Sequence, residues 1–202
     1  MILDHLVVGA TTLSEAQAHI EECFGLHMQP GGQHAVFHTH NMLLGLEDGL
    51  YLEAIAPDPS RPAPHRPRWY DLDRAAGPAR LGNWAAAVTD MDADLSTMPH
   101  GVGMPVDVQR GALQWRMAVS ADGTTPFDNL WPALIEWPPG VHPAGALVPS
   151  GLRLRRLTLR HPQGQALDAA LETHIRDDRI AVEVGPVAMQ AVFDGPDGER
   201  TL

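Results

Sequence analysis

The stretch HTHNMLLGLEDGLYLEAIA, residues 38–56, carries polar side chains inside an apolar, strand-like pattern. Two imidazoles, an amide and a carboxylate are costly to bury there without partners. Imidazole and carboxylate groups transfer protons and bind divalent cations. The alternation on both sides of a central EDG turn predicts two strands of a hairpin. We therefore expect a cleft faced by some of these side chains, which belong to His38, His40, Asn41 and Glu53.

An internal repeat connects this stretch with a second one. LDHLVVGATTLSEA aligns with LGNWAAAVTDMDAD, so that His5 matches Asn83. YLEAIAP likewise resembles ALIEWPP, with Glu53 opposite Glu136. A repeat can set the symmetry of both a fold and its site. We therefore predict that His5, Glu53, Asn83 and Glu136 converge in one cleft.

Each copy of the repeat is predicted to form a β-α-β-β-β unit. An apolar strand leads into a helix, which begins at the Thr12–Glu15 capping box in the first copy and at Asp90 in the second. Three strands follow in each copy, and two of the three are expected at 27–37 and 39–46 in the first and at 106–109 and 112–119 in the second. The units span residues 1–57 and 81–149, and the Pro- and Arg-rich residues 58–80 form the linker between them.

Residues 150–202 are predicted to form a partial third βαββ unit packed on the same domain. LRLRRLTLR alternates apolar and basic residues, with a slip at Arg155 and Arg156 that a bulge would explain. Arg156 stands at the position of His5, and no carboxylate occupies an obvious ligand position. We expect this segment to extend or cap a sheet without adding site residues. The predicted fold class is α+β.

Composition restricts the class of protein and its partners. A chain of 202 residues with 44% hydrophobic residues can bury a sizeable core. The N-terminus lacks a basic n-region, and the single Cys23 cannot form an internal disulfide, so a cytoplasmic location is the default expectation. With 25 acidic and 14 basic side chains, the formal net charge of -11 argues against nucleic acid or an anionic membrane surface as partner. Nucleotide-binding loops, nucleophile elbows and C-x-x-C pairs are absent from the sequence.

The order and spacing of LDHLVV, THN, YLEAIA and LIEW resemble the glyoxalase-like domains of the vicinal oxygen chelate superfamily. That superfamily includes glyoxalase I, extradiol dioxygenases, fosfomycin resistance proteins and bleomycin-binding proteins. The resemblance covers nearly the whole chain and is weakest over residues 150–202. It implies that the paired units curl into an open barrel and that alternate residues of each strand line a cleft.

The resemblance also implies a divalent metal in the cleft, with His5, Glu53 and Glu136 as ligands. Such an ion binds neighbouring substrate oxygens and acts as a Lewis acid on an enolate or other oxyanion. Asn83 departs from the pattern, because an imidazole is usual at its position and an amide oxygen is a poor ligand for Zn²⁺ or Fe²⁺. The remaining groups suffice for a divalent ion (Mn, Ni, Zn, Mg or Fe), or for a polar cleft without any metal. The sequence leaves both alternatives open.

Other candidates follow from strand parity and composition. His40 or Asn41 reaches the cleft as a proton carrier or orienting donor, because neighbours on a strand point to opposite faces unless a bulge intervenes. Glu136 is a second catalytic candidate, although a sheet edge before Trp137 is a competing position for it. Substrate contacts are expected from Asn41 and Asn83 and from an apolar wall of Trp84, Trp115, Phe127 and Trp137. Aromatic side chains at strand positions are more often plain core, so these four are candidates only.

Two functions of different class remain. The first is a metal-dependent lyase, isomerase or dioxygenase that acts on a small oxygenated metabolite. The second is a metal-free protein that binds or sequesters a small molecule, as bleomycin-binding proteins do. The sequence does not decide between them. It also leaves open whether the cleft forms within one chain or between the two chains of a homodimer.

Overall fold

One large sheet holds both repeat units of the chain. The computed structural model describes residues 1–202. The first unit contains β1 (Ile2–Gly9), α1 (Leu13–Phe24), β2 (Gln29–His34), β3 (Thr39–Gly45) and β4 (Tyr51–Pro57), with the short 3-10 turn η1 (Glu47–Gly49) before β4. The second contains β5 (Arg80–Ala87), α2 (Met91–Leu95), β6 (Met104–Arg110), β7 (Leu113–Val119) and β8 (Ala133–Glu136). The sheet therefore has eight strands, in the order β2-β3-β4-β1-β5-β8-β7-β6.

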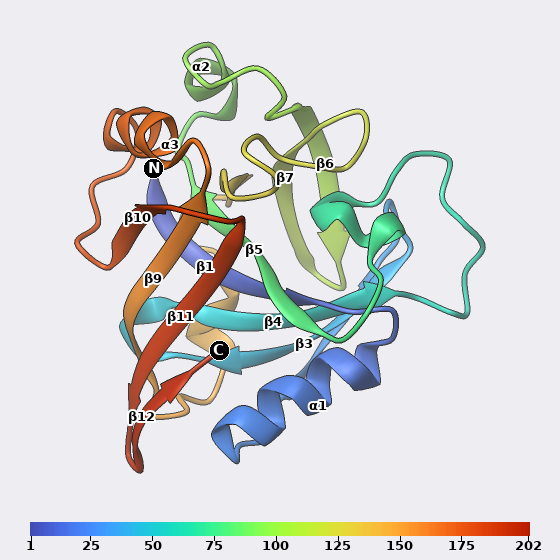
Figure 1. Ribbon diagram of the computed structural model, residues 1–202. Coiled ribbons are helices and arrows are strands. Elements are labelled where there is room, and N and C mark those ends of the chain that lie inside the picture. Colours follow the sequence, from blue (N-terminus) through green and yellow to red (C-terminus); the bar gives the residue numbers. More distant parts are fainter.

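The two units are joined by antiparallel pairing of their first strands, β1 and β5 (Figure 1). Within each unit the first strand also runs parallel to the closing strand, β1 to β4 and β5 to β8. The edge strands β2 and β6 lie close to each other. There is no room for a side chain at Gly32 of β2, where an added Cβ would lie 2.8 Å from Cγ of Arg110 in β6. The sheet is therefore a nearly closed, barrel-like structure, as expected for an α+β fold of this kind, and it forms within one chain.

Helix α1 covers the outer face of the barrel. It begins at the predicted capping box, in which the Thr12 side chain accepts from the Glu15 amide and the Glu15 side chain accepts from the Thr12 amide. It ends at Gly25, whose φ of 67° is in the left-handed region that glycine adopts readily. Its buried residues Ala16, Ile20 and Phe24 belong to the larger hydrophobic cluster, of 32 buried residues, which packs against the outer face of the barrel. We call this cluster the outer core. With 12 residues α1 is the longest helix, and no helix is long and apolar enough to cross a membrane.

Residues 150–202 form a second, four-stranded sheet with strand order β10-β9-β11-β12. Leu157, Leu159 and Phe193 pack in one core cluster with Trp84 and Leu6 of the barrel. A register shift opposite Arg155 lies where the sequence predicted a bulge. This part has one strand more than predicted, and β9 pairs in parallel with the next strand rather than with a closing strand. Its elements are β9 (Arg153–His161), α3 (Gly164–Glu172), β10 (Ile180–Val184), β11 (Ala188–Gly195) and β12 (Gly198–Thr201), preceded by η3 (Pro143–Ala146).

The linker, residues 58–80, also contributes buried side chains to the barrel. Its 3-10 segment η2 (Trp69–Arg74) buries Trp69, Tyr70 and Leu72 in a smaller hydrophobic cluster. This cluster also contains Val7 of β1 and Ile135 of β8, so it lies on the inner face of the barrel. The sequence did not predict that the linker enters the cleft.

Candidate functional site

A buried imidazole lies between two carboxylates on the inner face of the barrel. His5 Nδ1 is 2.6 Å from Oδ1 of Asp4, and His5 Nε2 is 3.5 Å from Oε2 of Glu53. The register shift between Leu3 and His5 is what allows these two neighbouring side chains to pair. Asp4, His5 and Glu53 are 3%, 2% and 5% exposed. We call these three residues the triad.

The triad is charged in the folded protein. Burial disfavours the protonated form of His5, but the hydrogen bonds and charges of Asp4 and Glu53 outweigh burial and raise the pKa of His5 to about 9. Burial likewise opposes ionisation of both carboxyls, yet hydrogen bonds from His142 and His5 hold the pKa of Asp4 below its usual range, and His5 lowers the pKa of Glu53. His5 is therefore an imidazolium at neutral pH.

Each carboxylate of the triad has further donors. Trp137 Nε1 donates to Oδ2 of Asp4 over 3.0 Å, and His142 Nε2 lies 3.1 Å from the same oxygen. On the other side, Asn41 Nδ2 donates to Oε1 of Glu53 over 2.5 Å. These contacts fix both carboxylates, and they satisfy the general requirement that buried charges be paired and hydrogen-bonded.

Asn41 is itself held by the neighbouring strand, where its side-chain oxygen accepts from the amide of Gly32 over 2.9 Å. A Cβ added at Gly31 would lie 2.0 Å from this oxygen. We therefore expect Gly31→Ala to lower the free energy of unfolding by about 1–3 kcal/mol, in the range of overpacked sites. Urea denaturation measures the change. Gly145→Ala is the control, since a Cβ there meets no atom within 4 Å; equal losses in both variants would contradict the prediction.

Tyr70 reaches the triad from the linker. Its hydroxyl lies 3.2 Å from Nε2 of His5. Its backbone is left-handed, with φ 57° and ψ 24°, a strained conformation for an aromatic residue. Asn83 Nδ2 donates to the carbonyl oxygen of Tyr70 over 3.2 Å and so supports this turn. Burial and the nearby carboxylates of Glu53 and Asp4 raise the pKa of Tyr70 well above its usual value, so the phenol stays protonated.

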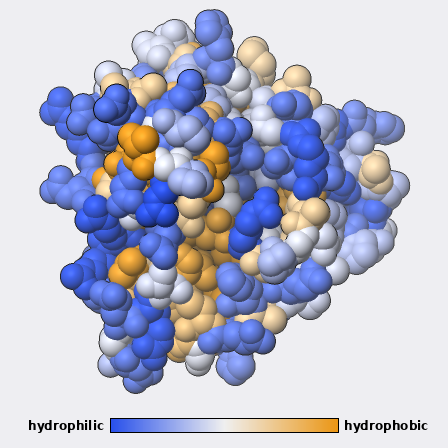
Figure 2. Space-filling view, viewed as in Figure 1, coloured by the Kyte–Doolittle hydropathy of each residue, from blue (hydrophilic) through white to orange (hydrophobic).

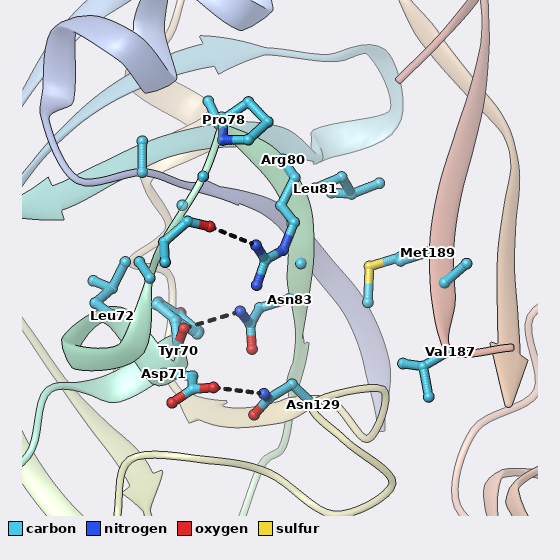
Figure 3. A pocket seen from close by; sticks show the side chains of 18 of the residues that line it. Tyr70, Asp71, Leu72, Pro78, Arg80, Leu81, Asn83, Asn129, Val187 and Met189 are labelled. Atoms are coloured by element: carbon cyan, nitrogen blue, oxygen red, sulfur yellow. Dashed lines mark hydrogen bonds between the residues drawn. The ribbon is translucent and has the colours of Figure 1, made fainter.

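A cavity of about 430 Å³ lies on the side of Tyr70 and Asn83 where β5 faces β11 (Figure 3). Its polar wall includes Asp71 and Asn129, and its apolar wall includes Met189 from the second sheet. Hydrophobic side chains gather along the middle of the molecular face that carries β11, bordered by hydrophilic ones (Figure 2). Residues 150–202 therefore contribute to the wall of a cavity, contrary to the expectation that they add nothing to a site.

Glu136 does not join the triad. Ile135 of β8 and Trp137, the residue after the strand, both contact the inner cluster, so the side chain of Glu136 between them points outward. Its Oε1 accepts from the amide of Met91 and its Oε2 from Arg116, each over 3.0 Å. The predicted convergence of four residues is thus wrong for Glu136, because strand parity places it on the outer face.

The other candidates separate by the face on which they lie. Asn41 faces Glu53, whereas His40 makes no hydrogen bond with the triad, and its Nε2 is buried without a partner. Trp84 lies in the outer core, where its Nε1 donates to the carbonyl oxygen of Leu130. Phe127 packs against that same core. Trp115 and Trp137, with ring centroids 5.1 Å apart, instead line a separate groove of about 910 Å³.

The residues present do not fit the expected four-position metal site. Only His5 and Glu53 come together, whereas both carboxylate oxygens of Glu136 are engaged on the outer face. No group of three or more His, Cys, Asp or Glu side chains is arranged to hold an ion. A divalent metal therefore stays a prediction of the family resemblance alone.

Comparison with known proteins agrees with this architecture. The sequence profile of the glyoxalase-like domain matches residues 3–175. The chain belongs to this family. Its barrel of paired units is accordingly that of the vicinal oxygen chelate superfamily. A crystal structure of a hypothetical protein from Staphylococcus aureus is similar, with a TM-score of 0.61 and 14% identity, covering 93% of this chain and 88% of that chain. At that identity the likeness concerns the fold alone, and no curated protein matches.

The signal for Tyr70 was present in the sequence but easy to miss. RWYDLD places a Trp, a Tyr and a Leu close together within the Pro- and Arg-rich linker, and large apolar side chains grouped in this way favour burial. Asp4 was adjacent to a predicted site residue, yet strand parity alone would point it to the opposite face. Only the register shift in β1 brings it to His5.

Proposed function

We propose that this glyoxalase-like protein is a lyase or isomerase that acts on a small oxygenated metabolite without a metal. The observation that carries the proposal is the phenol of Tyr70, 3.2 Å from an imidazolium that is itself held by two buried carboxylates. Groups with such perturbed pKa values, next to a cavity, are typical of catalytic sites. A structural core gains little from burying them.

The Tyr70–His5 pair supplies the hydrogen-bond donor that polarises the substrate carbonyl. Because His5 carries both ring protons, its Nε2–H donates to the oxygen of Tyr70, which leaves the phenolic proton free for a substrate oxygen. Burial and the nearby carboxylates keep the phenol protonated, so it acts as a hydrogen-bond donor to the substrate. A carbonyl that accepts this proton or hydrogen bond is polarised, and the negative charge that develops on its oxygen is stabilised.

Asp71 is the proposed base. Its carboxylate lines the cavity beside Tyr70 and is oriented by Arg74 at 2.7 Å and by Asn129 at 3.3 Å. The C–H bond next to the carbonyl breaks, its proton goes to the Asp71 carboxylate, and the electron pair forms an enolate or enol held by Tyr70. When the carbon that loses the proton carries a hydroxyl, Tyr70 gives its proton to the carbonyl oxygen and the intermediate is an enediol. Asp71 then returns the proton to the former carbonyl carbon, the proton of the adjacent hydroxyl goes to the Tyr70 phenolate, and the isomeric carbonyl compound results. In a lyase reaction a leaving group on the next carbon departs instead with its bonding electron pair.

A small-molecule binding protein is the second candidate. The groove of about 910 Å³ lined by Trp115 and Trp137 favours it, since aromatic walls are typical of sites that bind a planar compound. Trp137 also donates to Asp4, so a ligand in this groove would contact the triad indirectly.

Hydrogen exchange distinguishes the two candidates. The protein is incubated in D₂O with a panel of small oxo and hydroxy-oxo compounds, and proton NMR follows deuterium entry at the carbon beside the carbonyl. We expect catalysed exchange for at least one compound, and loss of exchange with Asp71→Asn. Compounds that bind, as seen by saturation transfer, without any exchange would contradict the enzyme and support the binding protein.

A further inference from the structure

The cavity beside Tyr70 offers both a free hydrogen-bond acceptor and free donors. Asn83 is 7% exposed, its nitrogen is used by Tyr70, and its side-chain oxygen accepts no hydrogen bond. Among the donors of the same wall, Asn129 Nδ2 donates to Asp71 and one N–H of Arg80 donates to the carbonyl oxygen of Ala76, which leaves further N–H groups of Arg80 free (Figure 3). A ligand that satisfies this wall therefore needs a donor for Asn83 and can also accept from Arg80.

The wall carries charged groups of both signs. The Asp71 carboxylate pairs with Arg74 at 2.7 Å, and Asp128 and Arg80 add one acidic and one basic side chain to the lining. A wall with both signs has no excess of one charge that would require a charged ligand. Hydroxyl groups can donate to the oxygen of Asn83 and accept from Arg80, so a neutral hydroxylated compound fits this wall.

The opposite wall is apolar and comes mainly from the C-terminal part of the chain. Val187 and Met189 face the polar groups across the cavity, next to Leu81 of β5 (Figure 3). A volume of about 430 Å³ is near the lower end of the usual range of about 300–1,000 Å³ for small-molecule sites. A molecule with hydroxyl groups on one side and carbon-bound hydrogens on the other matches these two walls.

Backbone strain is concentrated around the same cavity. Tyr70 and Asp71, with φ of 57° each, face Asp128 and Asn129, with φ of 53° and 70°. Strained non-glycine residues collect at functional sites, where the surrounding structure holds them for a purpose. The two strained segments are joined across the cavity by the contact between Asn129 and Asp71.

We infer that this cavity binds a small, neutral, polyhydroxylated carbonyl compound of the size of a short-chain sugar, with the oxygen of Asn83 accepting from one of its hydroxyls. The carbonyl end of the ligand lies toward Tyr70, and this orientation rests on the proposed function. Recognition of the hydroxyls does not depend on it. The inference names a substrate class for the site and a specificity-determining role for Asn83.

Binding of D-erythrulose tests the inference directly. Titration calorimetry and saturation-transfer NMR are run with D-erythrulose, with 2-butanone, which lacks the hydroxyls, and with serinol, which keeps two hydroxyls and has a protonated amine in place of the carbonyl. We expect a millimolar dissociation constant for D-erythrulose and at least about tenfold weaker binding of the other two, equivalent to about 1.4 kcal/mol. Failure of D-erythrulose to bind, or equal binding of 2-butanone or serinol, would overturn the inference.

Two variants locate the binding. Asn83→Leu should weaken D-erythrulose binding at least about tenfold, and Met189→Trp should do the same by filling the cavity from β11 without removing a polar group. Gln114→Leu removes an amide from the separate groove lined by Trp115 and should change binding less than about twofold. Thermal denaturation checks that each variant is folded. If Met189→Trp and Asn83→Leu bind like the parent, the ligand lies elsewhere and the inference fails.

The outcomes also separate this inference from the proposed reaction. Binding of D-erythrulose that depends on Asn83, without deuterium exchange in any compound, would support the binding site and contradict the lyase or isomerase. Exchange in other compounds, with no binding of D-erythrulose, would support the enzyme and overturn the substrate class.

Discussion

Tyr70→Phe is expected to lower catalysed deuterium exchange by about 100-fold, the lower end of what general acid catalysis contributes. The substitution keeps the ring that fills the inner cluster and removes only the hydroxyl that lies 3.2 Å from His5 Nε2. The KM of the exchanging compound should change little, because the hydroxyl acts mainly on charge that develops in the transition state. NMR exchange rates at several substrate concentrations give both constants.

Tyr51→Phe provides a matched control for this prediction. Tyr51 is the only other tyrosine of the chain, and its ring stacks on the His5 ring at 4.5 Å, but its hydroxyl makes no contact with Nε2. The Tyr51→Phe variant should exchange deuterium at a rate within about threefold of the parent. An equal loss in both variants would assign the effect to packing around His5 and remove Tyr70 from the reaction.

The fold was largely predictable because it depends on periodic patterns. Alternation in LDHLVV and YLEAIA, the capping box at Thr12 and the internal repeat give two β-α-β-β-β units and their pairing. These signals are local, and the core of 32 buried residues reinforces them. The family assignment follows the same signals and is confirmed over residues 3–175.

The site was predicted only where it follows strand parity in a regular strand. Asn41 and Glu53 face each other across β3 and β4 as neighbouring inward positions. Glu136 was placed wrongly because ALIEWPP was aligned by letter similarity to YLEAIAP, while Ile135 and Trp137 occupy the inward positions. A one-residue offset in a strand moves a side chain to the opposite face.

The remaining site residues depend on irregular structure, for which the sequence has no periodic signal. Asp4 pairs with His5 only through a register shift in β1. Tyr70 reaches the triad through a left-handed turn in a linker, supported by Asn83 from β5. Asn83 therefore has a different task from the metal ligand expected at its position: it orients the linker that enters the cleft.

The stability of the folded protein should fall as the pH rises from about 6.5 to about 9. In the folded state Asp4 and Glu53 raise the pKa of His5 to about 9 from an ordinary value of 6.5. The folded state thus binds more protons in this window, so the contribution of His5 is complete below pH 6.5 and is lost as the pH passes through 9. The shift corresponds to a change of about 3 kcal/mol in the free energy of unfolding.

Below this window a second histidine acts in the opposite direction. Burial lowers the pKa of His34 to about 4, with the charge of Glu53 only partly opposing it. The unfolded state then binds more protons between pH 4 and 6.5, so stability is lost as the pH falls through this range. The two buried imidazoles together predict a stability maximum near pH 6.5.

Urea denaturation at half-unit pH steps separates the His5 contribution from the rest. His5→Gln should flatten the decline between pH 6.5 and 9, whereas His27→Gln should leave it unchanged, because the His27 side chain is 97% exposed. Asp4→Asn removes one of the two carboxylates that hold the imidazolium and should move the decline to lower pH. A decline that persists in His5→Gln would mean that another group controls it. The triad would then not contain the buried imidazolium on which the proposed acid, Tyr70, depends.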